Sequence, residues 1–247
     1  MNKQINWRVG CSGFHYKEWA AIFYPPGLPQ RLWFDHYAKH FNTLELNATF
    51  YQFPKLAPLQ KWFITSPDDF VFSLKVPRII THYKKFKGTE QLLADFYNVV
   101  QEGLGNKLGA VLFQLPPQFQ YNAERLQLLI SSVKKEYNNV IEFRHNSWWQ
   151  QEVYNELGKH NISFCGSSHP KLPDDVIINT SIVYYRFHGV PELFRSRYEN
   201  DFLQKKADGI KQNKKIATAY MYFNNTAGPA ALANAKWLQD YVSAGKK

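Results

Sequence analysis

The chain has 247 residues, 45% of them hydrophobic and 17% aromatic, and its formal net charge is +10. This length and apolar content suit one large α/β domain or two small ones, with ample material for a core. The charge favours anionic partners such as phosphates, nucleotides or nucleic acid without choosing among them, although a merely basic soluble protein would have it too. No apolar run in the sequence approaches the ~18 residues of a membrane span, so no membrane partner is predicted.

The two cysteines, Cys11 and Cys165, form neither a CxxC motif nor a metal-binding spacing. Reduced thiols are therefore favoured over a disulfide, as in a cytosolic protein. Residues 1–6 contain no apolar segment of the kind found in a signal peptide. Together these features predict a soluble protein with a cytoplasmic location.

Strand-like and helix-like segments alternate along the chain. Apolar alternation and β-rich composition predict strands at residues 8–13, 43–47, 72–76, 111–115, 140–145, 162–165, 184–188 and 221–224. Helical spacing, with Thr89 and Asn122 as N-caps, predicts helices at residues 30–41, 57–65, 90–103, 122–135, 150–159, 198–212 and 229–241. Residues 48–51 and the basic stretch 78–87 are predicted loops, and a loop or small helix is predicted near residues 173–174.

The number of repeating units predicts the architecture. Strands that alternate with helices imply a parallel sheet, and eight such units in ~250 residues predict a (β/α)8 barrel of the TIM type. A doubly wound open sheet, the rival fold, would need fewer strands and usually a glycine-rich first turn. Neither a GxGxxG motif nor a P-loop is present. With no repeat, low-complexity tract or linker, residues 1–247 are predicted to form a single domain.

Several predicted strands carry polar side chains on one face, near the C-terminal end of the run. In residues 140–145, Ile141 and Phe143 share one face, whereas Glu142 and Arg144 share the other. The same alternation recurs for Glu45, Asn47, Ser73, Lys75, Gln114, Arg186, His188 and Asn224. Surface strands would scatter such groups along their length, whereas the parallel strands of a barrel would gather them at one mouth, where TIM-barrel active sites lie.

Six groups of residues form a recognisable pattern in chain order. They are Val9–Phe14 with Trp19 and Phe23–Pro25; Leu44–Tyr51; Phe113–Pro117; Glu142–His145 with Ser147 and Trp148; Tyr185–Gly189; and Tyr222–Asn225. Together they resemble the YecE-like proteins, the domain-of-unknown-function family 72, over nearly the whole chain. The resemblance implies a TIM-type barrel and a mainly bacterial or archaeal cytoplasmic protein with no established reaction. Members often have an acidic residue after the sixth strand. Residues 165–169 contain none, so that role does not carry over.

The candidate catalytic residues are Glu45, Lys75, Glu142 and His188. Two carboxylates can divide acid and base duties when their surroundings separate their pKa values, which would suit glycoside hydrolysis or isomerisation. Lys75, buried among carboxylates, would serve as a Schiff-base nucleophile or a proton carrier. The structural alternative is that buried charges, a Lys75–Glu pair included, only satisfy one another and fix the barrel interior.

No metal or cofactor is predicted. Glu45, Glu142 and His188 would have to meet across the mouth to act as metal ligands. A serine or cysteine nucleophile is also disfavoured, because Ser12 lacks an obvious base and Cys11 points toward the helices by strand parity.

Anion binding has a precedent in TIM barrels, which often hold phosphate with the loops after strands seven and eight and a helix N-terminus. Here the loop after the seventh strand carries Arg195 and Arg197, and the loop after the eighth carries Asn224–Gly228 before the helix that begins at Pro229. The alternative for the two arginines is that they are solvent-exposed and bind nothing. The residues predicted to bind substrate or anion are Ser12, Asn47, Gln114, Arg144, Arg186, Arg195, Asn224 and Asn225.

Three functions follow as hypotheses. The first is an enzyme that acts by acid–base chemistry on a small anionic substrate, phosphorylated or sugar-like. The second is a nucleic-acid-binding or nucleic-acid-processing barrel, because the basic stretch 78–87 interleaves His82, Tyr83 and Phe86 in a way that suits a phosphate backbone and a stacked base. The third is a non-catalytic binding module on an old enzyme scaffold, since a fold does not fix a function.

Overall fold

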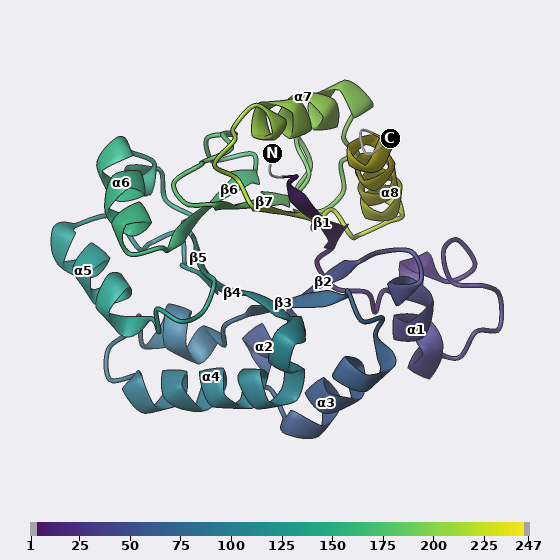
Figure 1. Ribbon diagram of the computed structural model, residues 1–247, viewed down its shortest axis with the longest axis horizontal. Helices are drawn as coiled ribbons and strands as arrows, with labels where there is room; N and C mark the ends of the chain where they lie inside the picture. The colour runs from purple at the N-terminus through teal and green to yellow at the C-terminus, as the bar shows by residue number, and fades with distance from the viewer. Residues whose placement is uncertain (1–3, 245–247) are drawn as a thin grey trace.

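The computed structural model describes residues 4–244 and contains a single sheet of eight parallel strands. The strands are β1 (Asn6–Cys11), β2 (Thr43–Leu46), β3 (Val71–Lys75), β4 (Leu108–Gln114), β5 (Asn139–Glu142), β6 (Ser163–Ser168), β7 (Ile182–Phe187) and β8 (Thr218–Phe223). Their order is β1-β8-β7-β6-β5-β4-β3-β2, so sequential strands are neighbours and β8 pairs with β1. Figure 1 shows the strands curving into a ring with the helices outside it. The predicted (β/α)8 barrel is confirmed.

The helices of the described residues cover the outside of this ring. They are α1 (Trp33–Ala38), α2 (Ala48–Tyr51), α3 (Leu56–Thr65), α4 (Glu90–Leu104), α5 (Ala123–Ser132), α6 (Gln151–Lys159), α7 (Asn200–Lys211) and α8 (Ala230–Ala244). Those that correspond to predicted helices differ from them by at most three residues at either end. Residues 169–181, between β6 and β7, contain no helix. None of the helices within residues 4–244 is long and apolar enough to cross a membrane.

Two segments predicted as loops contain helical turns. Residues 48–51 form the one-turn helix α2, because Thr49 Oγ1 donates to the carbonyl oxygens of Leu46 and Lys75 and so ties the turn to β2 and β3. The basic stretch 78–87 contains a π-helical turn, Ile79–Tyr83. Both turns follow strands at their C-terminal ends, so they help to build the rim of the barrel mouth.

The sixth strand is longer than the sequence indicated. It was predicted at residues 162–165, but β6 continues to Ser168, which pairs with Phe187 of β7. Gly166, Ser167 and Ser168 have low strand propensity, and the pairing with β7 overrides it. The extension matters for function because it carries Ser167 up to the level of the polar residues on the neighbouring strands.

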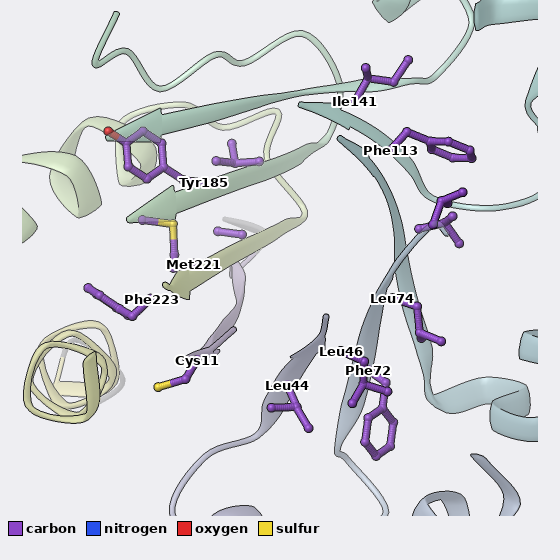
Figure 2. Close-up of a cluster of buried hydrophobic side chains, with 14 of the residues drawn as sticks. Cys11, Leu44, Leu46, Phe72, Leu74, Phe113, Ile141, Tyr185, Met221 and Phe223 are labelled. Carbon is purple, nitrogen blue, oxygen red and sulfur yellow. The ribbon is translucent and has the colours of Figure 1, made fainter. Parts of the chain in front are cut away.

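The two faces of the strands have different roles. The inward residues of the lower barrel form a buried cluster of Ala110, Leu112, Val140, Cys165, Tyr184, Tyr220 and Tyr222. Outward residues pack on the helices, which Figure 2 shows for Cys11, Leu44, Leu46, Phe72, Leu74, Phe113, Ile141, Tyr185, Met221 and Phe223. The predicted outward orientation of Cys11 is confirmed, and both cysteines are free and buried. Because this cluster fills the lower barrel, the polar inward residues lie together at the C-terminal ends of the strands.

The seam between β1 and β2 closes the barrel with little backbone pairing. One bridge joins Ser12 to Glu45, and the Tyr37 hydroxyl links the strands by accepting from the Cys11 N–H (2.7 Å) and donating to the Thr43 carbonyl oxygen (3.0 Å). Gly10 permits this approach, since a Cβ there would lie 2.3 Å from the Thr43 oxygen. A tyrosine from α1 therefore substitutes for missing strand pairing.

We expect the Tyr37→Phe variant to lose about 2–3 kcal/mol of unfolding free energy, because the buried Cys11 N–H and Thr43 carbonyl would lose their shared partner. Urea denaturation measures the loss. Tyr83→Phe is the matched control, since Tyr83 is exposed and removing its hydroxyl should change the free energy by under about 0.5 kcal/mol. Equal stability of the two variants would show that the seam does not depend on Tyr37.

Candidate functional site at the barrel mouth

Two buried carboxylates and one buried guanidinium form the centre of the mouth. Arg186, near the end of β7, lies between Glu45 of β2 and Glu142 of β5. Its Nη2 donates to Glu45 Oε1 and its Nη1 to Glu142 Oε2, each at 2.7 Å, and its Nε also reaches Glu45 Oε1 at 3.2 Å. Tyr184 donates its hydroxyl to the other oxygen of Glu45 at 2.6 Å. The two carboxylates are fully buried and Arg186 is almost so, which makes this a rigid ionic bridge across the barrel.

A second group of polar side chains continues from Glu142. Its Oε1 contacts Nε2 of His188 at 2.8 Å and Nη2 of Arg144 at 3.0 Å, while Nδ1 of His188 lies 2.9 Å from Nδ2 of Asn224. Because the Asn224 amide donates to Nδ1, the imidazole carries its proton on Nε2 and donates it to Glu142. Asn224 thus fixes both the tautomer and the orientation of His188.

Burial and neighbouring charges set the protonation states of this group. Burial would raise the pKa of Glu142, but the Arg144 and Arg186 guanidiniums outweigh it and hold that pKa well below its usual range. Burial and the positive charge of Arg144 lower the pKa of His188 well below its usual range. The His188–Glu142 contact is therefore a hydrogen bond from a neutral imidazole rather than an ion pair, and Glu142 is an anion.

Lys75, the last residue of β3, has no carboxylate partner. Its Nζ donates to Gln114 Oε1 at 2.6 Å and lies 3.8 Å from the centroid of the Phe50 ring, and no described carboxylate lies within 4.0 Å. Burial, followed by the charge of Arg186, lowers the pKa of Lys75 to about 7. The structural alternative of a direct Lys75–Glu pair is therefore wrong, because Nζ donates to the neutral amide oxygen of Gln114 and not to a carboxylate.

Several buried polar atoms around the mouth have no hydrogen-bond partner within residues 4–244. They are Ser12 Oγ, Asn47 Oδ1, Arg144 Nε and Ser167 Oγ. These residues lie at the C-terminal ends of β1, β2, β5 and β6, at the level of the ionic bridge. Buried polar groups are nearly always paired in folded proteins, so a group of unpaired atoms in one place is typical of a site for a ligand.

The structure separates the predicted site residues into three groups. Glu45, Glu142, Arg144, Arg186, His188 and Asn224 form one connected network, Lys75 and Gln114 form a pair beside it, and Ser12 and Asn47 present unpaired atoms. Asn225 is buried and donates its amide to Ser196 O and Asn234 Oδ1, so it attaches the loop after β7 to α8. Arg195 is exposed in that same loop.

Two contributors to the site were not among the predicted site residues. Tyr184, which bonds to Glu45, shares the inward face with Arg186, and strand parity alone would have found it. Ser167 was missed because the sixth strand was predicted to end before it. No three carboxylate, imidazole or thiol groups within the described residues are arranged to hold a metal ion. The sequence suggested one combination of metal ligands, Glu45 with Glu142 and His188. In the structure, Arg186 lies between the two glutamates and pairs with both.

A parallel (β/α)8 barrel with buried, paired charges at the C-terminal ends of its strands belongs to the TIM-barrel class. The chain belongs to the family described as "Protein of unknown function DUF72", whose model matches residues 8–247. This confirms the family membership that the sequence motifs indicated.

Curated and solved relatives agree with this membership. The UPF0759 protein YecE of Escherichia coli K12 is 31% identical over 216 residues, which cover 77% of this chain and 78% of that protein. The UPF0759 protein YunF of Bacillus subtilis is 29% identical over 81% of this chain and 73% of its own length. A DUF72 family protein of Thermotoga maritima, known from its crystal structure, superposes with a TM-score of 0.87 at 26% identity, covering 96% of this chain and 99% of its own.

Proposed function

We propose that the protein is an enzyme that binds a small anionic compound, phosphorylated or sugar-like, in the barrel mouth and acts on it by acid–base chemistry. The unpaired buried atoms of the mouth are the observation that carries this proposal. Each costs about 1–3 kcal/mol when it has no partner. An oxygen-rich ligand would satisfy them, because Arg144 Nε–H donates to an anionic oxygen, Asn47 Oδ1 accepts from a hydroxyl, and the Ser12 hydroxyl does either.

The charge distribution supports the choice of an anionic ligand. Within the central network, the carboxylates of Glu45 and Glu142 balance the guanidiniums of Arg144 and Arg186. The remaining charge is that of Lys75, which no described carboxylate contacts. Because the pKa of Lys75 is about 7, part of this amine is protonated at neutral pH, and a bound anion would attract and favour that form in the poorly solvated site.

Lys75 is also the group best suited to proton transfer. A catalytic acid or base works best when its pKa lies near the working pH, and the pKa of Lys75 is about 7. Glu142 and His188 are fully buried and bonded to one another, so in this proposal they orient Arg144 and set the local field. Glu45 holds Arg186 in place from the opposite side.

The test is a thermal-shift screen of inorganic phosphate, sugar phosphates, nucleotides and carboxylates, followed by NMR of each binding compound to detect conversion. We expect one chemical class to raise the melting temperature, and its affinity to fall at least about tenfold in Arg144→Gln, which loses the unpaired Nε–H and the charge. Arg31→Gln is the matched control, because Arg31 is exposed and makes none of the hydrogen bonds or ion pairs of the network.

The outcomes separate the hypotheses. Conversion by the parent protein that is lost in Lys75→Met supports an enzyme. Compounds that bind through Arg144 and are never converted would replace the proposal by a binding module. The absence of any response, or a response that Arg144→Gln leaves unchanged, would remove the mouth as the site.

A nucleic-acid-binding barrel is the second candidate, and one observation favours it. Arg78 lies 5.4 Å and 5.5 Å from the ring centroids of Tyr51 and Tyr83, and both rings are exposed, beside the exposed Lys84 and Lys85. Exposed aromatic faces next to cations suit stacked bases and phosphates. Oligonucleotide binding that weakens steeply with salt, and that Arg78→Gln reduces, would favour this candidate over a small-molecule enzyme.

A further inference from the structure

We infer that Lys75 is a reactive amine that forms a Schiff base with its substrate, which makes the substrate a small anionic aldehyde or ketone. This inference rests on the proposed function, because it uses the same mouth and the same anionic ligand, and it adds the functional group on which the enzyme acts.

Lys75 contacts two neutral partners and no carboxylate of the described residues. Gln114 Oε1 accepts one N–H of Nζ, and the Phe50 ring lies 3.8 Å away. Neither partner carries a negative charge that would hold the amine protonated. Arg144 and Arg186, in contrast, both contact carboxylates. The carboxylates of the site therefore pair with the guanidiniums. Lys75, the amine of the network that can form an imine, has no counter-ion among the described residues.

The position of Lys75 is firmly held. The carbonyl oxygen of Lys75 accepts from Thr49 Oγ1 at 2.6 Å, and the following residue, Val76, donates its N–H to the Leu112 oxygen of β4 at 2.9 Å. Lys75 is 8% exposed, so it is largely withdrawn from bulk water. Attack on a carbonyl carbon requires a nucleophile held in a fixed position, and the strand end and Gln114 hold this amine.

The charges around Lys75 come from four elements. Facing it are Glu45 of β2, Glu142 of β5 with Arg144 just after that strand, Arg186 of β7, and His82 of the π-helical turn. Burial is the largest influence on the pKa of Lys75, and the positive charge of Arg186 is the next, so a large share of the amine is neutral near pH 7. Burial also lowers the pKa of His82 to about 4, so this ring adds no charge at neutral pH.

The reaction balances without any other reagent. The lone pair of Nζ adds to the carbonyl carbon, and the C–N bond forms while the carbonyl oxygen takes up a proton. Loss of that oxygen as water, with two hydrogens that come from the amine, leaves the C=N bond. Protonated, this group withdraws electrons from the adjacent C–H or C–C bond, as imine-forming enzymes require. The unpaired Nε–H of Arg144 would bind the anionic end of the same substrate.

Reductive trapping tests the inference. The protein is incubated at pH 7 with dihydroxyacetone phosphate, glyceraldehyde 3-phosphate or pyruvate as separate probes, then reduced with borohydride, and modified lysines are identified by peptide mass spectrometry. We expect at least one probe to modify Lys75 at least about tenfold more than any other lysine. Lys75→Arg keeps a cation but cannot form an imine, so it should abolish this adduct, whereas the exposed control Lys55→Arg should leave it unchanged.

A second variant tests the role of the missing counter-ion. Gln114→Glu would place a carboxylate against Nζ, keep the amine protonated, and reduce trapping at pH 7 at least about tenfold, with recovery as the pH is raised. Adducts spread evenly over the lysines would overturn the Schiff base. If ligands still stabilise the protein through Arg144 in that case, the proposed function stands without it; if they do not, both fall.

Discussion

The Arg186→Met variant is expected to lose on the order of 3–5 kcal/mol of unfolding free energy, which is a large part of the stability of an ordinary domain. Arg186 is the partner of Glu45 and the main partner of one oxygen of Glu142, and both carboxylates are fully buried. Its removal would leave Glu45 with only the Tyr184 hydroxyl. A buried anion without a counter-ion is far more costly than the loss of a pair as a whole.

Chemical denaturation at pH 7 measures this effect, and two further variants show its origin. The double variant Glu45→Gln, Arg186→Met removes one pair of opposite charges together, leaves Glu142 with Arg144, and should recover at least half of the lost free energy. The exposed Arg78→Met should change the stability by under about 0.5 kcal/mol. A single Arg186→Met variant as stable as the Arg78→Met control would contradict the ionic bridge.

The fold and the composition of the mouth could be predicted from sequence because both depend on fixed periods. Side chains alternate strictly along a strand, so Glu45, Glu142 and Arg186 could be assigned to one face before any contact was known. Parallel strands end at the same edge of a barrel, and this placed them at one level. The strand boundaries were correct to within three residues, and at β6 the error lies at the C-terminal end, where pairing rather than propensity decides the end of the strand.

The partners within the mouth could not be predicted in the same way. Which side chains meet across a barrel depends on the stagger of the strands and on rotamers, and neither has a local signal. Lys75 was expected beside a glutamate, but it bonds to Gln114 of the neighbouring β4. Asn225 was predicted to bind an anion, and no sequence pattern indicated that its amide also donates to Ser196 O and Asn234 Oδ1. The side-chain chemistry at the mouth therefore had to come from the structure.

The Lys75→Met variant is expected to be more stable than the parent protein at pH 7, by about 2–3 kcal/mol. In the unfolded chain the lysine pKa is about 10.5, whereas in the folded protein it is about 7. Between these values the unfolded state binds a proton that the folded state does not, so the parent gains stability as the pH rises through this window. The full difference is on the order of 4–5 kcal/mol, and the lost Gln114 hydrogen bond and Phe50 contact offset part of it.

Urea denaturation of the parent and Lys75→Met at pH 6, 8 and 10 measures this difference, and other titrating groups cancel because both proteins share them. The advantage of the variant should be largest at or below pH 7 and should shrink steadily toward pH 10.5, where neither state of the parent holds the proton. An advantage that is constant with pH would show that Lys75 keeps an ordinary pKa. Lys55→Met, at an exposed position, should show no trend. A stabilised variant that also loses the ligand response would identify Lys75 as a residue kept for chemistry at the expense of stability.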